Sequence, residues 1–188
     1  PGDSRPPRAG FSNFYFNDYM SDEPPKFEPV SSGSVDVNLR FSRHGQITVV
    51  NKGPSSRGFR VCFQCGYAEA MPTRVSKKKR SNKPPAPHKK PGRRQTECNN
   101  MLSSRQLGHQ FLTDVVEVVL PISMEYEGAV STLAALLTGT KGLGISRDDV
   151  NGMVRPRGNQ EWSLVLFDNV PGGAGHVLRI RERFAELV

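Results

Sequence analysis

Two cysteines separated by two residues, Cys62 and Cys65, are the first candidates for chemistry in this sequence. Two intervening residues let both sulfur atoms reach one metal ion, and Gly66 tolerates the tight backbone that follows them. The third cysteine is Cys98, and His88 lies ten residues before it. We therefore expect a zinc site formed by Cys62, Cys65, Cys98 and His88. With four protein ligands such a site is closed, and hence structural rather than catalytic.

Two alternatives to this site stay open. A C-x-x-C pair can be a redox centre, but that form normally opens a helix in a thioredoxin-like context, which is absent around Cys62. His109 and His44 are rivals of His88 for the fourth ligand position. Three cysteines are too few for a disulfide framework, so the cysteine content favours a reducing compartment.

The positive charge of the chain is concentrated between residues 74 and 94. The sequence has 26 lysines and arginines against 18 acidic residues, a net charge of +8. This basic segment contains no acidic residue and ten basic residues: Arg74, Lys77, Lys78, Lys79, Arg80, Lys83, Lys89, Lys90, Arg93 and Arg94. The rest of the chain has 16 basic against 18 acidic residues. We interpret the segment as a contact surface for the phosphate backbone of DNA, with RNA as an alternative. A solvated flexible insertion over 71–97 without a ligand is the other interpretation.

A glycine-rich turn, Pro171-Gly172-Gly173-Ala174-Gly175-His176, separates a predicted buried strand from the last predicted helix. Glycines permit positive φ and expose N–H groups beside a helix N-terminus, which suits a phosphate. The turn matches neither nucleotide-binding glycine fingerprint, so a tight strand–helix connection is the alternative. No spacing ties Asp168, His176, Asp114 and Glu117 into an acid–base site, and we predict no catalytic residue.

Several classes of protein are excluded by the composition and the motifs. No run of 18 apolar residues is present, so we expect no membrane span, and the first residues do not form a secretory signal. The expected location is therefore cytoplasmic. No G-x-x-x-x-G-K-[ST] loop is present, so the chain is not a complete nucleotide-driven motor. Because the sequence begins at Pro1 rather than Met, we expect it to be a fragment of a longer protein.

The elements that must position these residues belong to the α+β class: a small mixed or antiparallel sheet with a zinc knuckle and two to three helices. Residues 1–34 are expected to be a proline-rich lead-in whose aromatic residues dock onto the domain or a neighbour, and 35–188 the domain itself. Alternating apolar residues predict a hairpin, with strands at 35–41 and 47–50 joined by a turn at 43–45. Further strands are predicted from residue 59 and at 111–120 and 164–167.

The 3.6-residue period of apolar residues predicts two helices. The first covers 127–137, with Val130, Leu133, Ala134 and Leu137 on its inner face, and the last covers 177–187. A capping box at Ser146 predicts a further short helical turn.

The order of several motifs resembles the C-terminal zinc-binding domain of mitomycin repair factor A-type helicases. The resemblance covers residues 35–188 and rests on these stretches: Gly45-x-Ile47-x-Val49-Val50-Asn51-x-Gly53, Gly58-Phe59-Arg60-Val61-Cys62-x-x-Cys65-Gly66 with Cys98, Leu107-Gly108-His109-x-Phe111-x-Thr113-Asp114-Val115, Gly144-Ile145-x-x-Asp148-Asp149-Val150-x-Gly152, and Leu166-Phe167-Asp168-Asn169-Val170-Pro171-Gly172-Gly173-Ala174-Gly175-His176-Val177. Domains of this family are appended to bacterial DEAD/DEAH-box helicases, including DNA-repair and phage-defence proteins.

The resemblance implies a non-catalytic accessory domain of a superfamily 2 helicase that assists nucleic-acid engagement. Its partners would be DNA and the helicase motor domains, in the same or a partner chain. The alternative is a protein-interaction scaffold that docks a motor subunit of a defence complex, through an exposed aromatic patch at residues 11–19.

Overall fold

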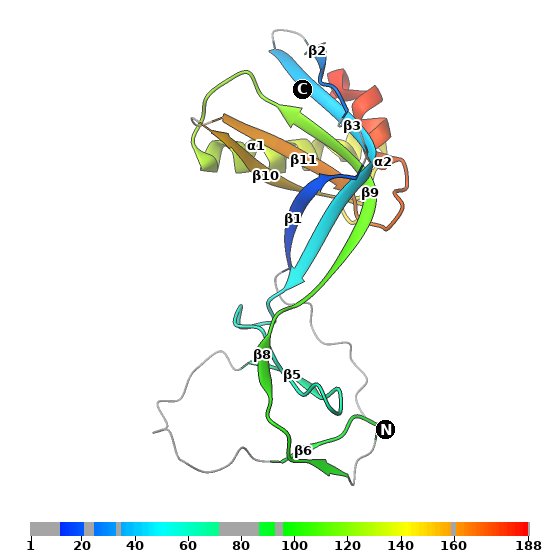
Figure 1. The fold of residues 1–188 in the computed structure, drawn as a ribbon. Helices are drawn as coiled ribbons and strands as arrows, with labels where there is room; N and C mark the ends of the chain where they lie inside the picture. The colour runs from blue at the N-terminus through cyan, green and yellow to red at the C-terminus, as the bar shows by residue number, and fades with distance from the viewer. Residues whose placement is uncertain are drawn as a thin grey trace. The chain divides into compact units, whose positions relative to one another are not determined.

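The chain is a mixed α+β protein, as expected, whose residues group into two compact units (Figure 1). This computed structural model describes residues 12–20, 25–32, 35–71, 87–92, 96–158 and 161–187. The metal-binding unit comprises Pro1–Asn13 and Val49–His109, and the sheet unit comprises Phe14–Thr48 and Gln110–Val188. None of the described helices is long and apolar enough to cross a membrane.

A sheet with the strand order β1-β3-β9-β11-β10 is the framework of the sheet unit. Its strands are β1 (Ser12–Tyr19), β3 (Val35–Asn51), β9 (Leu107–Val119), β10 (Val150–Gly158) and β11 (Glu161–Asp168), and β2 (Glu28–Ser32) pairs with β3. β11 is antiparallel to both of its neighbours, and its Leu166 pairs with Val116 on one side and Gly152 on the other. The apolar run at 164–167 is therefore a central strand, as the sequence predicted.

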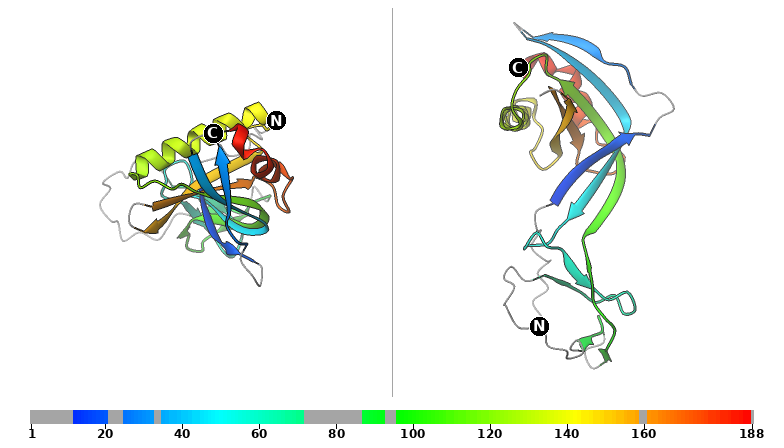
Figure 2. Two further views of the ribbon diagram at one scale, coloured as in Figure 1. Left: turned by 90° about the horizontal axis from the view of Figure 1, so that it is seen from above. Right: turned by 60° about the vertical axis from the view of Figure 1, so that its left-hand side comes forward.

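One face of this sheet is covered by the helices α1 (Tyr126–Gly139) and α2 (His176–Glu182), with the short 3₁₀ helices Thr140–Leu143 and Phe184–Glu186 (Figure 2). The core between the layers contains Leu39, Val116, Val118, Leu164, Leu166, Leu133, Leu136, Ile180 and Phe184. Because strand side chains alternate between faces, the residues between these core positions project from the opposite face. Arg40 and Glu117 are two of them.

The predicted hairpin over 35–50 is wrong, because β3 is one continuous strand of 17 residues. The residues predicted as its turn, 43–45, lie inside the strand, and the carbonyl of His44 accepts a hydrogen bond from the Met20 N–H (2.8 Å). A Cβ on Gly45 would lie 2.1 Å from a methyl carbon of Val115. The glycine is therefore needed for the close approach of Val115 rather than for a reversal of the chain.

The two predicted helices are confirmed, but the inner face of the first differs from the prediction. Its buried residues are Ala129, Leu133 and Leu136, whereas Val130 is 39% exposed. The last helix buries Val177, Ile180 and Phe184 as predicted, with Phe184 in the 3₁₀ turn after α2.

The region after Ser146 also differs from the prediction. It forms a tight turn, in which the Asp149 N–H donates to the Ser146 carbonyl (3.1 Å), and not a helical turn. The following strand, β10, was not predicted because Gly152 and Pro156 interrupt its sequence pattern. Pro156 is tolerated since β10 is an edge strand of the sheet.

Three aromatic residues of the lead-in pack within the sheet unit, whereas Tyr15 is 44% exposed. The Phe14 ring lies 5.3 Å from the Phe167 ring, and Phe16 lies 4.9 Å from Tyr19. Phe11 lies outside the described residues. These ring contacts hold Phe14, Phe16 and Tyr19 within the fold, so they offer little to the exposed patch that the scaffold alternative requires.

Candidate metal centre

A tight knuckle between β4 (Phe59–Val61) and β5 (Ala68–Ala70) positions the first two cysteines. The N–H of Cys62 donates to the Tyr67 carbonyl (2.8 Å), and the N–H of Gly66 donates to the Cys62 carbonyl (2.9 Å). Gly66 has φ +75°, a conformation that side-chain-bearing residues rarely adopt. The glycine after the C-x-x-C motif therefore closes the turn around the two sulfur atoms. β4 also pairs with β8 (Ser103–Arg105), which completes a three-stranded sheet.

A short antiparallel ladder positions the other two candidate ligands. β6 (His88–Lys89) pairs with β7 (Glu97–Cys98), and His88 lies directly opposite Cys98. The Lys90 N–H extends the ladder with a hydrogen bond to the Thr96 carbonyl (3.0 Å). Two residues that are ten positions apart in the sequence thus meet on neighbouring strands.

The four predicted ligands form one cluster, whose Sγ and imidazole nitrogen atoms all lie within 4.8 Å of one another. The Sγ atoms of Cys62 and Cys98 are 3.9 Å apart, and Cys65 Sγ is 3.2 Å from His88 Nε2. A tetrahedral zinc ion with Zn–S bonds of about 2.3 Å separates two of its sulfur ligands by about 3.8 Å. The donor set and spacing therefore fit a metal ion, and all three cysteines are free rather than paired in a disulfide.

The pKa values of the two knuckle cysteines are shifted in opposite directions. A hydrogen bond from the Cys65 backbone, aided by the Gln64 backbone, lowers the pKa of Cys62 to about 6. Burial raises the pKa of Cys65. Metal ligation requires thiolates, so the backbone of the knuckle favours the ligating form of Cys62.

His88 is a residue of the ladder, and its side chain is buried against the knuckle. The Tyr67 ring packs on its imidazole with 4.8 Å between ring centroids, and the Tyr67 hydroxyl donates to Glu69 Oε2 (3.0 Å). The Nδ1 atom of His88 is buried without a hydrogen-bond partner among the described residues. Packing, rather than a second hydrogen bond, therefore orients the imidazole toward the cysteines. His44 and His109, its rivals in the sequence, are outside the cluster that the described residues form.

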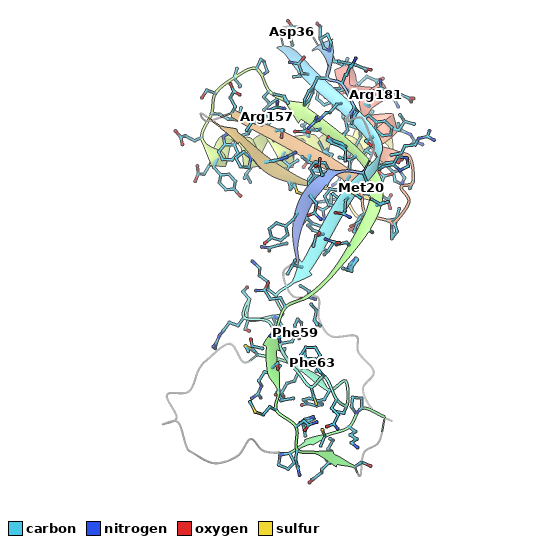
Figure 3. The ribbon with its side chains drawn as sticks, viewed as in Figure 1. Met20, Asp36, Phe59, Phe63, Arg157 and Arg181 are labelled. Atoms are coloured by element: carbon cyan, nitrogen blue, oxygen red, sulfur yellow. The ribbon has the colours of Figure 1, made fainter. Side chains whose placement is uncertain are left out.

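An open pocket of about 610 Å³ borders the centre and is lined by Arg60, Tyr67, Glu69, Pro87, His88, Lys89, Met101 and Leu102. Outside that lining, Phe63 of the knuckle is 72% exposed (Figure 3). The Arg105 guanidinium lies 5.3 Å from the centroid of the Phe63 ring. The metal-binding unit thus exposes apolar and cationic groups together.

The structure describes two of the ten basic residues of the basic segment, Lys89 and Lys90. Lys89 is exposed and Lys90 half-buried, directly after His88. The other eight lie outside the described residues: Arg74, Lys77, Lys78, Lys79, Arg80, Lys83, Arg93 and Arg94.

The amide groups of the glycine turn face a carboxylate of the protein itself. Asp168, which is fully buried, accepts hydrogen bonds from the N–H groups of Ala174 (2.6 Å), His176 (3.1 Å) and Val177 (2.9 Å). The Thr113 hydroxyl also contacts the carbonyls of Asp168 (2.9 Å) and Val170 (2.8 Å). The turn that was predicted to suit a phosphate therefore already binds an internal anion, which matches the alternative of a tight connection.

The remaining acidic candidates divide between two environments. Burial, together with the charge of Asp168, raises the pKa of Asp114, whose carboxyl group lies against Gly173. Glu117 lies instead among arginines, 2.6 Å from Arg40 Nη2. The sequence did not predict a site at Arg40, Arg155 or Arg157, although the spacing of Arg155 and Arg157 is that of residues on one face of a strand.

A solved structure is similar to this chain. No protein-family model matches the chain, and no curated protein matches it either. A crystal structure of the DUF1998 helicase MrfA bound to DNA is similar over 94% of this chain, with 13% sequence identity and a TM-score of 0.40. The match covers 19% of that helicase, so this chain spans about a fifth of its length.

Proposed function

We propose that the chain is an accessory zinc-binding module of a superfamily 2 DNA helicase, which assists nucleic-acid engagement in DNA repair or anti-phage defence. The observation that carries this proposal is the convergence of Cys62, Cys65, His88 and Cys98 on one point. The order of sequence motifs supports the helicase context. The module itself performs no catalysis.

Zinc is the metal that this donor set favours. Three thiolates and one imidazole are soft or borderline ligands, and four-coordinate sites of this type are typical of structural zinc. Four protein ligands leave no open position for water or substrate. Bound zinc would therefore tie the knuckle to the β6–β7 ladder and stabilise the metal-binding unit.

Two of the ligands flank the basic segment, and His88 lies within it. The chain leaves the cluster at Cys65, returns to it at His88 and again at Cys98, and all ten basic residues lie between the first and the last of these. Bound metal would close these loops and lower the conformational entropy that the segment loses on binding. We propose that zinc in this way presents the basic segment to the phosphate backbone.

This proposal predicts salt-dependent binding of single-stranded DNA by the full chain, measured by fluorescence anisotropy. The test variant is Lys89→Gln with Lys90→Gln, and its control is Lys141→Gln with Arg147→Gln, which removes the same charge from the sheet unit. The test pair should reduce the slope of log K against log salt by about 1.4, and the control should leave it unchanged. Zinc content is measured for each protein. Equal slopes in the two zinc-loaded variants, or salt-insensitive binding, would contradict the proposal.

A further inference from the structure

A pocket of about 290 Å³ in the sheet unit is lined by Arg40, Glu117, Arg155, Pro156 and Arg157. Three strands contribute to it: β3, β9 and β10. Arg40 and Glu117 alternate with residues of the helix-covered core, so they project from the opposite face of the sheet. Arg155 and Arg157 are two residues apart on β10, where the register with β11 shifts between Pro156 and Gly158, and both line the pocket.

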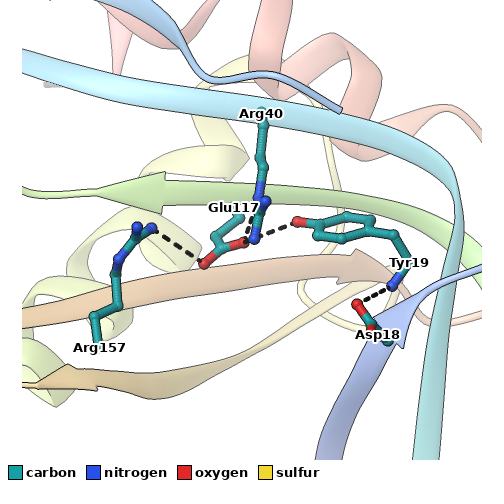
Figure 4. A network of polar contacts seen from close by, with 5 residues as sticks. All are labelled: Asp18, Tyr19, Arg40, Glu117 and Arg157. Carbon is teal, nitrogen blue, oxygen red and sulfur yellow. Dashed lines mark hydrogen bonds and ion pairs between the residues drawn. The ribbon is translucent and has the colours of Figure 1, made fainter. Parts of the chain in front are cut away.

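The lining of this pocket sets one carboxylate against three guanidinium groups. Figure 4 shows two of these groups, those of Arg40 and Arg157, on either side of Glu117. Glu117 is 1% exposed, and its Oε2 accepts hydrogen bonds from Arg40 Nε (2.7 Å) and from the Tyr19 hydroxyl (2.9 Å). Its Oε1 lies 3.8 Å from Arg157 Nη1. Burial opposes ionisation, but the polar groups of Ser163, Arg40 and Tyr19 outweigh it and lower the pKa of Glu117. The lining thus contains three cations and one anion, an excess of two positive charges.

Aromatic rings hold the guanidinium groups in place without neutralising them. The Arg40 guanidinium lies between the rings of Tyr19 (4.5 Å) and Phe27 (4.4 Å), measured to the ring centroids. The Phe27 ring also contacts Arg157 (5.0 Å). Cation–π contacts restrict these side chains without adding a second counter-charge to that of Glu117.

We propose that this pocket binds a phosphate group. Planar guanidinium groups match phosphate oxygens bidentately, and the excess positive charge suits one dianionic phosphate or two neighbouring phosphodiesters. Arg155 and Arg157 are neighbours on one strand and line the same pocket, so they can contact neighbouring phosphates of an extended polynucleotide. The phosphate can come from a nucleic-acid backbone or from a free anion. The inference goes beyond the proposed function, because it uses neither the metal centre nor the basic segment.

The experiment compares Arg155→Gln with Arg147→Gln in the full zinc-loaded chain. Both variants lose one positive charge from the sheet unit, but Arg147 is exposed and is not among the residues that line the pocket. One arm measures anisotropy with a labelled deoxythymidine oligonucleotide at several salt concentrations. The other measures the rise in Tm that inorganic phosphate produces over chloride at equal ionic strength. Circular dichroism without ligand verifies that both variants are folded.

The pocket predicts that Arg155→Gln weakens one of these two responses about tenfold, while Arg147→Gln stays within twofold of the unchanged protein. Loss in the oligonucleotide arm identifies a polynucleotide backbone as the source, and loss confined to the phosphate arm identifies a free anion. Because neither arginine belongs to the metal-binding unit, the comparison stands even if the basic segment makes no contact with DNA. Equal behaviour of the two variants in both arms, or a larger response to poly-glutamate than to either phosphate ligand, would overturn the proposal.

Discussion

Replacement of Asp168 by asparagine tests how the glycine turn is held. The buried carboxylate accepts three backbone hydrogen bonds, two at Oδ2 and one at Oδ1. A hydrogen bond to a charged group contributes about 1.5–3 kcal/mol. Asparagine keeps one acceptor oxygen, so at least one N–H loses its partner and the others lose the charge. Relief of the repulsion with Asp114 offsets part of this loss, and we expect Asp168→Asn to lower the free energy of unfolding by about 2 kcal/mol.

Urea unfolding of the zinc-loaded protein, followed by circular dichroism, measures this change. The matched control is Asp148→Asn, at an exposed carboxylate, which should stay within about 0.5 kcal/mol of the unchanged protein. The amide hydrogen of Val177 should also exchange faster in Asp168→Asn, because its acceptor is weakened. Equal stability of the two variants with unchanged exchange at Val177 would refute the reasoning.

Three further predictions concern the sheet unit, to which Asp168 also belongs. A Cβ at Gly173, where φ is +75°, would lie 2.4 Å from Asp114 Cγ, whereas Gly172, with φ +83°, has open space. Gly172→Ala should therefore lower the free energy of unfolding by about 1 kcal/mol, and Gly173→Ala should lower it by more than twice as much. Equal Tm values of the two variants would contradict the predicted clash. A raised pKa means that folded Asp114 binds its proton more tightly than the unfolded chain does, so its ionisation costs stability above the unfolded pKa. Asp114→Asn should thus raise the Tm at pH 7, and the gain should vanish below about pH 3.9; a gain that persists in acid would count against this cause. Glu117→Gln should lower the free energy of unfolding by about 3–5 kcal/mol in urea denaturation, because the Arg40 side chain, which is only 16% exposed, loses its carboxylate. A loss below 1 kcal/mol would show that the ion pair does not stabilise the fold.

The cluster of three cysteines and one histidine was the most predictable feature of the sequence, because few residue types are suited to bind a metal ion. C-x-x-C followed by glycine defines a local turn, and the turn observed between Cys62 and Tyr67 depends only on neighbouring residues. His88 was harder to assign, since its position depends on pairing with Cys98 across a ladder that has no strong strand pattern.

The errors in the fold arose where tertiary contacts override local signals. Gly45 resembles a turn residue in sequence, yet it serves the close approach of Val115, 70 positions later. The sequence pattern of the glycine turn does not reveal that Asp168, just before the turn, accepts amide hydrogens of the turn. The arginine pocket was not predicted because its residues come from three strands, and only the sheet order brings them together.

Elemental analysis of the purified full chain is the most direct test of the central claim, that Cys62, Cys65, His88 and Cys98 hold one zinc ion. We expect one zinc per chain in the unchanged protein and none in Cys62→Ser. We expect His109→Ala to keep its zinc and His88→Ala to bind it at least tenfold more weakly. A folded chain that contains no metal, or zinc that survives the loss of Cys62, would contradict the account.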